Sequence, residues 1–331
     1  IRMAILVGFT ATLLLGGWFT LEGTMAVGAY SVLVFMTQRL LWPLTRLGET
    51  FDLYQRAMAS STRVLDVLAS PIELQQGEYS PALEARKASS IALEDVFFGY
   101  PDREPLFNGL SLTFEHGKTT GVVGSTGAGK TSLVRLLLRF AEPQRGNVTW
   151  CNRPIEAWKL HSLRSSIALV DQHITLFPTT ILENIRYGRP DATDEEVVRA
   201  AEIAEAAAFV ADLPSGWDTL VGEGGHRLSG GQRRRGAIAG AVVKEAPLLV
   251  LAADTSAVDT DADAALQRSI ERISRDRTTI VIAHRLSTVR HADRIVVLEQ
   301  GKVVEDGTHD GLVAQAGIYA RLWSVQTGEA Q

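Results

Sequence analysis

Two long apolar stretches open the chain, with a short polar connection between them. The first runs over residues 3–21 without a charged side chain, close to the ~20 apolar residues that a helix needs to cross a bilayer. The second follows residues 22–24 and runs over residues 25–43, with Gln38 and Arg39 near its end. This pattern predicts two membrane-spanning helices joined as a hairpin.

The arginines around these stretches predict which side of the membrane the rest of the chain occupies. Arg2 precedes the first stretch, and four arginines lie at the end of the second or beyond it: Arg39, Arg46, Arg56 and Arg63. Because basic residues favour the cytoplasmic side, we expect an integral protein of the inner or plasma membrane, with everything downstream of the hairpin in the cytoplasm. A secretory signal peptide and a buried hairpin of a soluble protein are the alternatives. Since the chain starts at Ile1, we expect further membrane helices upstream.

The hydrophobic pattern changes twice after the hairpin. Residues 44–68 place apolar side chains at helical spacing, which predicts that the second helix continues into the cytosol. A polar stretch follows, and from Ile91 short β-rich runs alternate with helical patterns, as is typical of an α/β domain. We therefore expect three parts: a membrane segment at 1–70, a linker at 71–90 and an α/β domain at 91–331.

The charge and cysteine content of the chain exclude some classes of partner and site. The chain is 46% hydrophobic and 21% charged, and its formal net charge of −5 provides no broad basic field, so we expect no nucleic-acid partner. Three consecutive arginines, Arg233 to Arg235, are interpreted as a solvated helix face. Cys151 is the single cysteine, which excludes an intrachain disulfide and a cysteine metal cluster and fits a reducing compartment.

A phosphate-binding loop is the strongest chemical signal. Gly124 is followed after four residues by Gly129-Lys130-Thr131, between an apolar strand pattern and a helical run. Glycines let backbone N–H groups turn toward phosphates, Lys130 would reach the β- and γ-phosphates, and the Thr131 hydroxyl would bind Mg²⁺. We expect ATP and Mg²⁺ as cofactors. The loop residues are Gly124, Ser125, Thr126, Gly127, Ala128, Gly129, Lys130, Thr131 and Ser132.

A second glycine motif indicates a family. Leu228-Ser229-Gly230-Gly231-Gln232 opens another helical pattern about a hundred residues after the phosphate loop, and it resembles the signature of ATP-binding cassette (ABC) transporters. The resemblance covers essentially the whole chain. It implies an α/β P-loop NTPase cassette preceded by a transmembrane α-helical hairpin, as in the C-terminal part of a fused exporter half. Such cassettes work as dimers, with ATP between the phosphate loop of one and the signature of the other.

Four further positions take roles that this resemblance implies. Tyr100 matches the aromatic residue that stacks on adenine, and Gln172 matches the glutamine that senses the γ-phosphate, binds Mg²⁺ and lies in a loop touching the membrane helices. His284 matches the switch histidine at the γ-phosphate, so Gln172 and His284 are the candidate catalytic residues. Asp259 matches the aspartate of a loop that reaches across the dimer.

The sequence departs from the family pattern at three places. Asp171 stands where a proline is usual, and Gly224 replaces an arginine in the segment before the signature, which predicts altered coupling. The third departure is larger. Exporters of this family carry Asp-Glu at the end of the strand that here reads "LLVLAA", and counting back from Asp259 places those acids on Ala252 and Ala253.

The missing acids predict a site that binds ATP but hydrolyses it slowly. Removing a group that holds Mg²⁺ typically costs about 10–100-fold, and removing a general base about 10²–10⁴-fold in rate. One alternative is a two-residue strand slip that brings Asp254 into play. The alanine pair is compatible with a natural variant and with an engineered trap for ATP-bound dimers.

The leading hypothesis is the ATP-binding subunit of an ABC exporter whose signature supports hydrolysis in a second exporter half. A heterodimer is favoured and a homodimer is possible. The first alternative is a non-hydrolysing regulatory half, and the second is a soluble ABC ATPase acting on DNA or ribosomes. The transported substrate stays open among drugs, lipids, peptides and siderophores.

Overall fold

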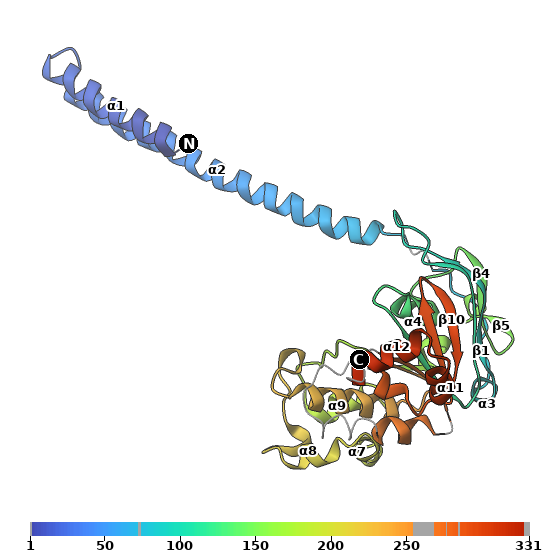
Figure 1. Cartoon of the computed structure of the whole chain (residues 1–331). Helices are drawn as coiled ribbons and strands as arrows, with labels where there is room; N and C mark the ends of the chain where they lie inside the picture. Colours follow the sequence, from blue (N-terminus) through green and yellow to red (C-terminus); the bar gives the residue numbers. More distant parts are fainter. Residues whose placement is uncertain (1, 72–73, 254–267, 276, 284, 328–331) are drawn as a thin grey trace. The chain divides into compact units, whose positions relative to one another are not determined.

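The computed structural model describes residues 2–71, 74–253, 268–275, 277–283 and 285–327 (Figure 1). The chain divides into two compact units, residues 1–74 and 75–331, and each is described by itself.

The first unit is a helical hairpin. Helix α1 spans Arg2–Leu21 and helix α2 spans Val27–Ala69, with Pro43 inside α2 (Figure 1). The two helices approach closely, because a Cβ on Gly16 would lie 2.9 Å from the Tyr30 ring. The Tyr30 hydroxyl also donates a hydrogen bond to the carbonyl oxygen of Leu13, at 3.1 Å. The predicted hairpin and its helical continuation are thus confirmed.

Whether the helices of this hairpin can cross a membrane depends on their length and apolar character. Over the part of the chain that the structure describes, no helix combines the length and the apolar character that a membrane span requires. The two spans predicted from the sequence are therefore helices, and their insertion into a membrane stays a prediction.

Residues 75–90, which belong to the linker expected at 71–90, are bonded into the second unit. Tyr79 bridges to Trp158, and its backbone N–H donates to the Ala157 oxygen at 2.9 Å. A Cβ on Gly77 would lie 2.1 Å from that same Ala157 oxygen, so only glycine fits there. The short helix α3 (Leu83–Lys87) follows, and the Arg86 guanidinium donates to the Ser166 hydroxyl at 2.6 Å. The compact unit consequently starts before the predicted domain boundary.

Arg139 ties this polar segment to the unit from the inside. Its side chain is 2% exposed, and it donates to the Gln75 carbonyl oxygen at 2.7 Å and forms an ion pair with Glu142 at 2.6 Å. We expect Arg139→Met to lower the free energy of unfolding by about 2 kcal/mol, because it leaves the Gln75 carbonyl and the partly buried Glu142 carboxylate without their buried donor. Urea denaturation measures this. The control Arg145→Met removes an arginine whose side chain is 73% exposed and should change stability by less than about 0.5 kcal/mol. Equal losses in both variants would contradict the structural role of Arg139.

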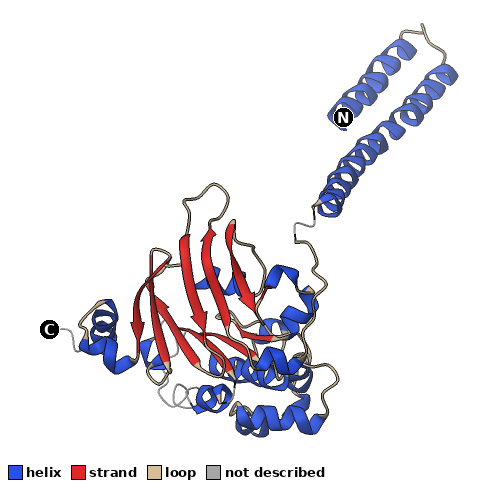
Figure 2. Ribbon diagram, turned by 90° about the vertical axis from the view of Figure 1, so that its right-hand side faces the viewer, coloured by secondary structure: helices blue, strands red, loops and turns tan. Residues whose placement is uncertain are grey.

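Two sheets form the second unit (Figure 2). The smaller is antiparallel with strand order β2-β1-β4-β5, where β1 is Ile91–Phe98, β2 is Phe107–Phe114, β4 is Arg145–Trp150 and β5 is Arg153–Pro154. The first strand starts at Ile91, where the sequence pattern placed the start of the β-rich region.

The larger sheet has six strands in the order β10-β9-β3-β8-β7-β6. Only β10 runs antiparallel to its neighbour, and the other pairs are parallel. Parallel strands place their carboxyl ends at one edge of a sheet, which is where α/β proteins bind ligands. The strands are β3 (Thr119–Gly124), β6 (Ile167–Val170), β7 (Leu248–Ala253), β8 (Thr278–Ala283), β9 (Arg294–Glu299) and β10 (Lys302–Gly307).

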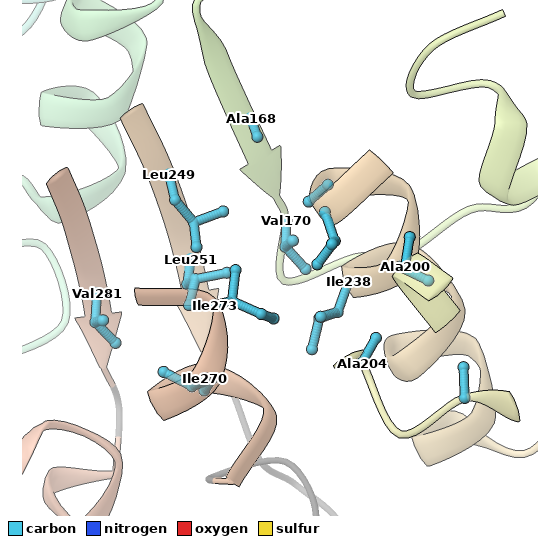
Figure 3. Close-up of a cluster of buried hydrophobic side chains, with 14 of the residues drawn as sticks. Ala168, Val170, Ala200, Ala204, Ile238, Leu249, Leu251, Ile270, Ile273 and Val281 are labelled. Atoms are coloured by element: carbon cyan, nitrogen blue, oxygen red, sulfur yellow. The ribbon is translucent and has the colours of Figure 1, made fainter. Parts of the chain in front are cut away.

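Helices pack around both sheets (Figure 2). One hydrophobic core joins β6, β7 and β8 to α7 (Asp194–Ile203) and α9 (Gly230–Val243), and Figure 3 shows Val170, Leu251 and Ile238 converging there. A second core lies around β1, β2, β3 and α4 (Lys130–Leu137). Further helices are α5 (Leu160–Ser165), α6 (Ile181–Arg186), α8 (Ala207–Ala211), α11 (His309–Ala314) and α12 (Ile318–Thr327). Residues 268–274 are also helical, and 3₁₀ turns lie at Ile155–Ala157, Gly216–Asp218, Glu223–Gly225 and Leu286–Val289.

Candidate functional site

The phosphate loop joins β3 to α4, as the sequence predicts. Gly124 has φ +154°, and a Cβ there would lie 2.1 Å from the Leu298 carbonyl oxygen. Gly129 has φ +107°, and a Cβ there would lie 2.5 Å from the Phe107 ring. Both positions therefore require glycine, and they shape the backbone that a phosphate would approach at the N-terminus of α4.

Lys130 places a positive charge inside this loop. Its ammonium donates to the carbonyl oxygens of Gly124 at 2.7 Å and Ser125 at 2.9 Å, and its side chain is buried. Burial lowers the pKa of Lys130 from its ordinary value, because the charged form loses hydration. An anionic phosphate beside the ammonium would oppose that shift, because it would stabilise the charged form.

Gly129 offers a direct test of the loop geometry. We expect Gly129→Ala to lower the free energy of unfolding by about 3 kcal/mol, because it adds both backbone strain and a clash with the Phe107 ring. Gly117 also has a positive φ of +70°, but a Cβ there meets nothing within 4 Å, so Gly117→Ala should cost only about 1 kcal/mol. Chemical denaturation compares the two. Similar losses would mean that the Phe107 contact does not constrain Gly129.

The aromatic residue predicted to stack on adenine lies next to the loop. Tyr100 follows β1 and is partly buried, with its ring at 5.1 Å from the Phe98 ring in an edge-on arrangement. The hydroxyls of Tyr100 and Ser132 are hydrogen-bonded at 3.0 Å. Two predicted site residues that are far apart in the sequence are thus brought together.

Further candidate residues lie at the carboxyl edge of the large sheet. Gln172 follows β6, and its backbone N–H is bonded to the Asp171 carboxylate at 2.7 Å. Ala252 and Ala253 end β7, and they pair with Ile282 and Ala283 of β8. The pairing of β7 with β8 is continuous from Leu248 to Ala253, and the slip that would bring Asp254 into play stays an alternative. This edge therefore gathers the loop, the glutamine and the alanine pair.

Three residues of interest lie outside the described part of the chain. They are the switch candidate His284, the dimer-loop candidate Asp259 and the alternative acid Asp254. Strand β8 ends at Ala283, directly before the first of them.

The signature segment starts α9 with a capping box. The Ser229 hydroxyl oxygen accepts a hydrogen bond from the Gln232 N–H at 3.2 Å, and the Gln232 side chain accepts one from the Ser229 N–H at 2.9 Å. Gly230 and Gly231 occupy the first turn, at the positive end of the helix dipole. Because the Ser229 oxygen acts as an acceptor, its own hydrogen can be donated to a phosphate oxygen.

Comparison with known proteins agrees with these two glycine motifs. Residues 107–254 match the ABC transporter family. The chain is 43% identical over 312 residues to the ATP-dependent lipid A-core flippase of Chromohalobacter salexigens, covering 94% of this chain and 53% of the relative. It is 41% identical over 331 residues to the protein of that name from Chromobacterium violaceum, covering 100% of this chain and 56% of the relative. The chain belongs to the ABC transporter family.

A solved structure extends the similarity to the hairpin. A bacterial Atm1-family ABC exporter with ATP bound superposes with a TM-score of 0.75 at 34% identity, over 98% of this chain and 57% of that chain. The predicted fold class, an ABC cassette after a helical hairpin, is thereby confirmed. The chain spans about half the length of the curated relatives it matches.

The replacement of the usual arginine by Gly224 has a structural counterpart in this ABC cassette. Gly222, Gly224 and Gly225 all have positive φ values, at +76°, +62° and +79°. A side chain in this left-handed region carries strain of roughly 1–2 kcal/mol. The segment before the signature therefore has a backbone shape that suits glycine at position 224.

The three arginines after the signature are not a solvated face, and that prediction is wrong. All three are partly buried. The Arg233 guanidinium donates to the Leu228 carbonyl oxygen at 2.7 Å, and the Arg235 guanidinium lies 5.2 Å from the centre of the Phe209 ring. Arg233 therefore holds Leu228, the residue before Ser229. The only sign of this role in the sequence is the position of Arg233 near the start of α9.

The described residues also bear on the expected Mg²⁺. Among them, no group of three or more His, Cys, Asp or Glu side chains could hold a metal ion. Thr131 is exposed on the first turn of α4, and Gln172 is exposed after β6. Both supply neutral oxygens, which suits Mg²⁺ that is bound mainly by the phosphates of a nucleotide.

Proposed function

We propose that this chain is the ATP-binding part of an ABC exporter half, and that its own site binds ATP and hydrolyses it slowly. The observation that carries the proposal is the contrast along one sheet edge. The phosphate loop after β3 is shaped for a nucleotide, while β7 ends in Ala252 and Ala253. Methyl groups at these positions can neither orient Mg²⁺ nor accept a proton from water.

Each motif then has a distinct role. Lys130 and the loop N–H groups bind the phosphates, Tyr100 stacks on adenine, and Thr131 with Gln172 would hold Mg²⁺. When bound, Mg²⁺ neutralises charge on the phosphate oxygens. The segment Leu228–Gln232 and the Asp259 loop act on ATP held by a second cassette, and His284 contacts the γ-phosphate.

The alanine pair favours a heterodimer. A homodimer would carry the pair at both sites and would hold two ATP molecules with no acid to promote hydrolysis. A partner half with intact acids would receive the signature of this chain and hydrolyse ATP at that composite site. A regulatory half that never hydrolyses ATP is the alternative supported by the same pair.

A cleft beside the Gln172 loop suits contact with membrane helices. Its volume is about 510 Å³, and it is lined in part by Phe140, Phe177 and Tyr187. These aromatic side chains are 57%, 48% and 67% exposed, so an apolar surface of this cassette is open to a partner segment. This surface and the flippase relatives support an inner-membrane exporter of an amphipathic lipid, and they argue against a soluble ABC ATPase.

Mixing two inactive variants tests the proposed division of roles. One copy is the unaltered chain, which has the signature but not the acids. The other carries Ala252→Asp and Ala253→Glu together with Ser229→Arg, so it has the acids but not the signature. We expect ATP hydrolysis only in the mixture. The positive control is the chain that carries Ala252→Asp and Ala253→Glu and keeps Ser229. If this control hydrolyses ATP and the mixture does not, the proposal that the signature acts in trans is overturned.

A further inference from the structure

Arg135 lies against the aromatic ring that we assign to adenine. It projects from the second turn of α4 and is exposed. Its guanidinium carbon is 5.8 Å from the centre of the Tyr100 ring, within the range of a cation–π contact. The same guanidinium donates to the Tyr100 hydroxyl at 3.3 Å. One side chain thus contacts both the ring and the hydroxyl of Tyr100.

Ser132 holds the same hydroxyl from the first turn of α4. Its own hydroxyl is buried and lies 3.0 Å from the Tyr100 oxygen. Two residues of one helix therefore fasten the tip of this tyrosine, and the Phe98 ring meets it at 5.1 Å. The ring is oriented by the helix that also carries the phosphate loop.

This fastening matters because Tyr100 stands at the start of an exposed segment. Residues 101–105 are all exposed, and a tyrosine at such a place would otherwise sample several side-chain rotamers. Ordering a free ring when a ligand arrives reduces affinity, whereas a ring already held in place avoids that loss. Holding the ring in place should strengthen binding of the base alone, since the phosphates bind at the phosphate loop and not at Tyr100.

We propose that Arg135 is a positioning residue for base binding: together with Ser132 it holds the Tyr100 ring as a platform for the purine. The inference rests on the proposed function, in which Tyr100 stacks on adenine. The competing role for an exposed arginine on this helix is long-range attraction of the triphosphate. The two roles predict different effects of losing Arg135. A positioning role weakens binding of the base, whereas charge attraction weakens binding of the triphosphate.

Binding of two ligands by the whole chain in detergent separates these roles. Calorimetry with Mg²⁺ measures Kd for ATP and for inorganic tripolyphosphate, which has no base. We expect Arg135→Gln to weaken ATP binding about three- to tenfold, the range expected when one cation–π contact and one hydrogen bond are lost. Binding of tripolyphosphate should stay within about twofold, because its charge and contacts on the loop are unchanged.

Two further variants sharpen the test. Arg145→Gln removes a similar contact, an exposed arginine 5.0 Å from the centre of the Phe97 ring, and should leave both affinities unchanged. In a Tyr100→Leu background, Arg135→Gln should have no further effect on ATP, because a positioning residue acts through the ring it positions.

Each contrary result has a distinct meaning. Equal weakening of ATP and tripolyphosphate by Arg135→Gln would overturn the proposal and assign Arg135 to charge attraction. An unchanged ATP affinity would also overturn it, while the proposed function would stand. Failure of the unaltered chain to bind either ligand would overturn the proposed function and this inference together.

Discussion

Two acids placed at the end of β7 should turn a site that binds ATP but hydrolyses it slowly into a hydrolytic one. We expect Ala252→Asp with Ala253→Glu to raise Mg²⁺-dependent ATP hydrolysis by about 10²–10⁴-fold, the range typical of a positioned general base, with a further gain from a group that holds Mg²⁺. The structure supports this because β7 pairs with β8 as far as Ala253, so positions 252 and 253 end β7 at the same edge of the sheet as the strand that leads into the phosphate loop. Steady-state phosphate release measures the rate.

A matched pair of variants separates charge from size in this experiment. Ala252→Asn with Ala253→Gln adds side chains of the same shape that cannot act as bases, and it should stay near the rate of the unaltered chain. The variant Lys130→Ala sets the baseline. If the unaltered chain already hydrolysed ATP far above that baseline, Asp254 would become the candidate acid and a self-sufficient homodimer the better interpretation.

Loss of Lys130 should abolish tight ATP binding. Its buried ammonium lies within hydrogen-bonding distance of two loop carbonyls, where phosphate oxygens would compete for it. Charge-assisted hydrogen bonds to phosphate are worth about 1.5–3 kcal/mol each, so we expect Lys130→Ala to raise the Kd of Mg²⁺-ATP by about 100-fold. Fluorescence titration or calorimetry measures this change.

Lys244 provides the control for Lys130. Its ammonium likewise donates to two carbonyl oxygens, those of Arg164 at 2.9 Å and Ile167 at 2.7 Å, and burial lowers its pKa. It lies outside the phosphate loop, so Lys244→Ala should reduce stability and leave the Kd for ATP nearly unchanged. Equal losses of ATP binding in both variants would show that the effect of Lys130→Ala comes from damage to the fold.

The features that the sequence predicted best are those encoded by short, regular spacing. The phosphate loop needs glycines at Gly124 and Gly129 and a lysine directly after, and each requirement is visible in the local sequence. The helical hairpin follows from long apolar stretches, and the start of β1 at Ile91 follows from the change to a β-rich pattern. These features depend on residues that are close together in the sequence, so they can be predicted without knowledge of the fold.

What the sequence did not predict depends on contacts between distant polar residues. Arg139 reaches the Gln75 carbonyl across 64 positions, and Arg135 reaches Tyr100 across 35. No periodicity marks these partners, because each bond forms only after the sheets have brought the segments together. A contact with a distant segment also separates the arginines after the signature from the predicted solvated face, because the Arg235 guanidinium lies 5.2 Å from the centre of the Phe209 ring.

The chemical identity of the nucleotide that the chain retains shows whether its own site hydrolyses ATP. The whole chain is incubated with Mg²⁺ and ATP, separated rapidly from free nucleotide and denatured, and the released nucleotide is identified by chromatography. We expect intact ATP to be recovered from the unaltered chain and almost none from Lys130→Ala. Recovery of ADP in place of ATP from the unaltered chain would contradict this expectation, because Ala252 and Ala253 would then not have disabled hydrolysis at this site.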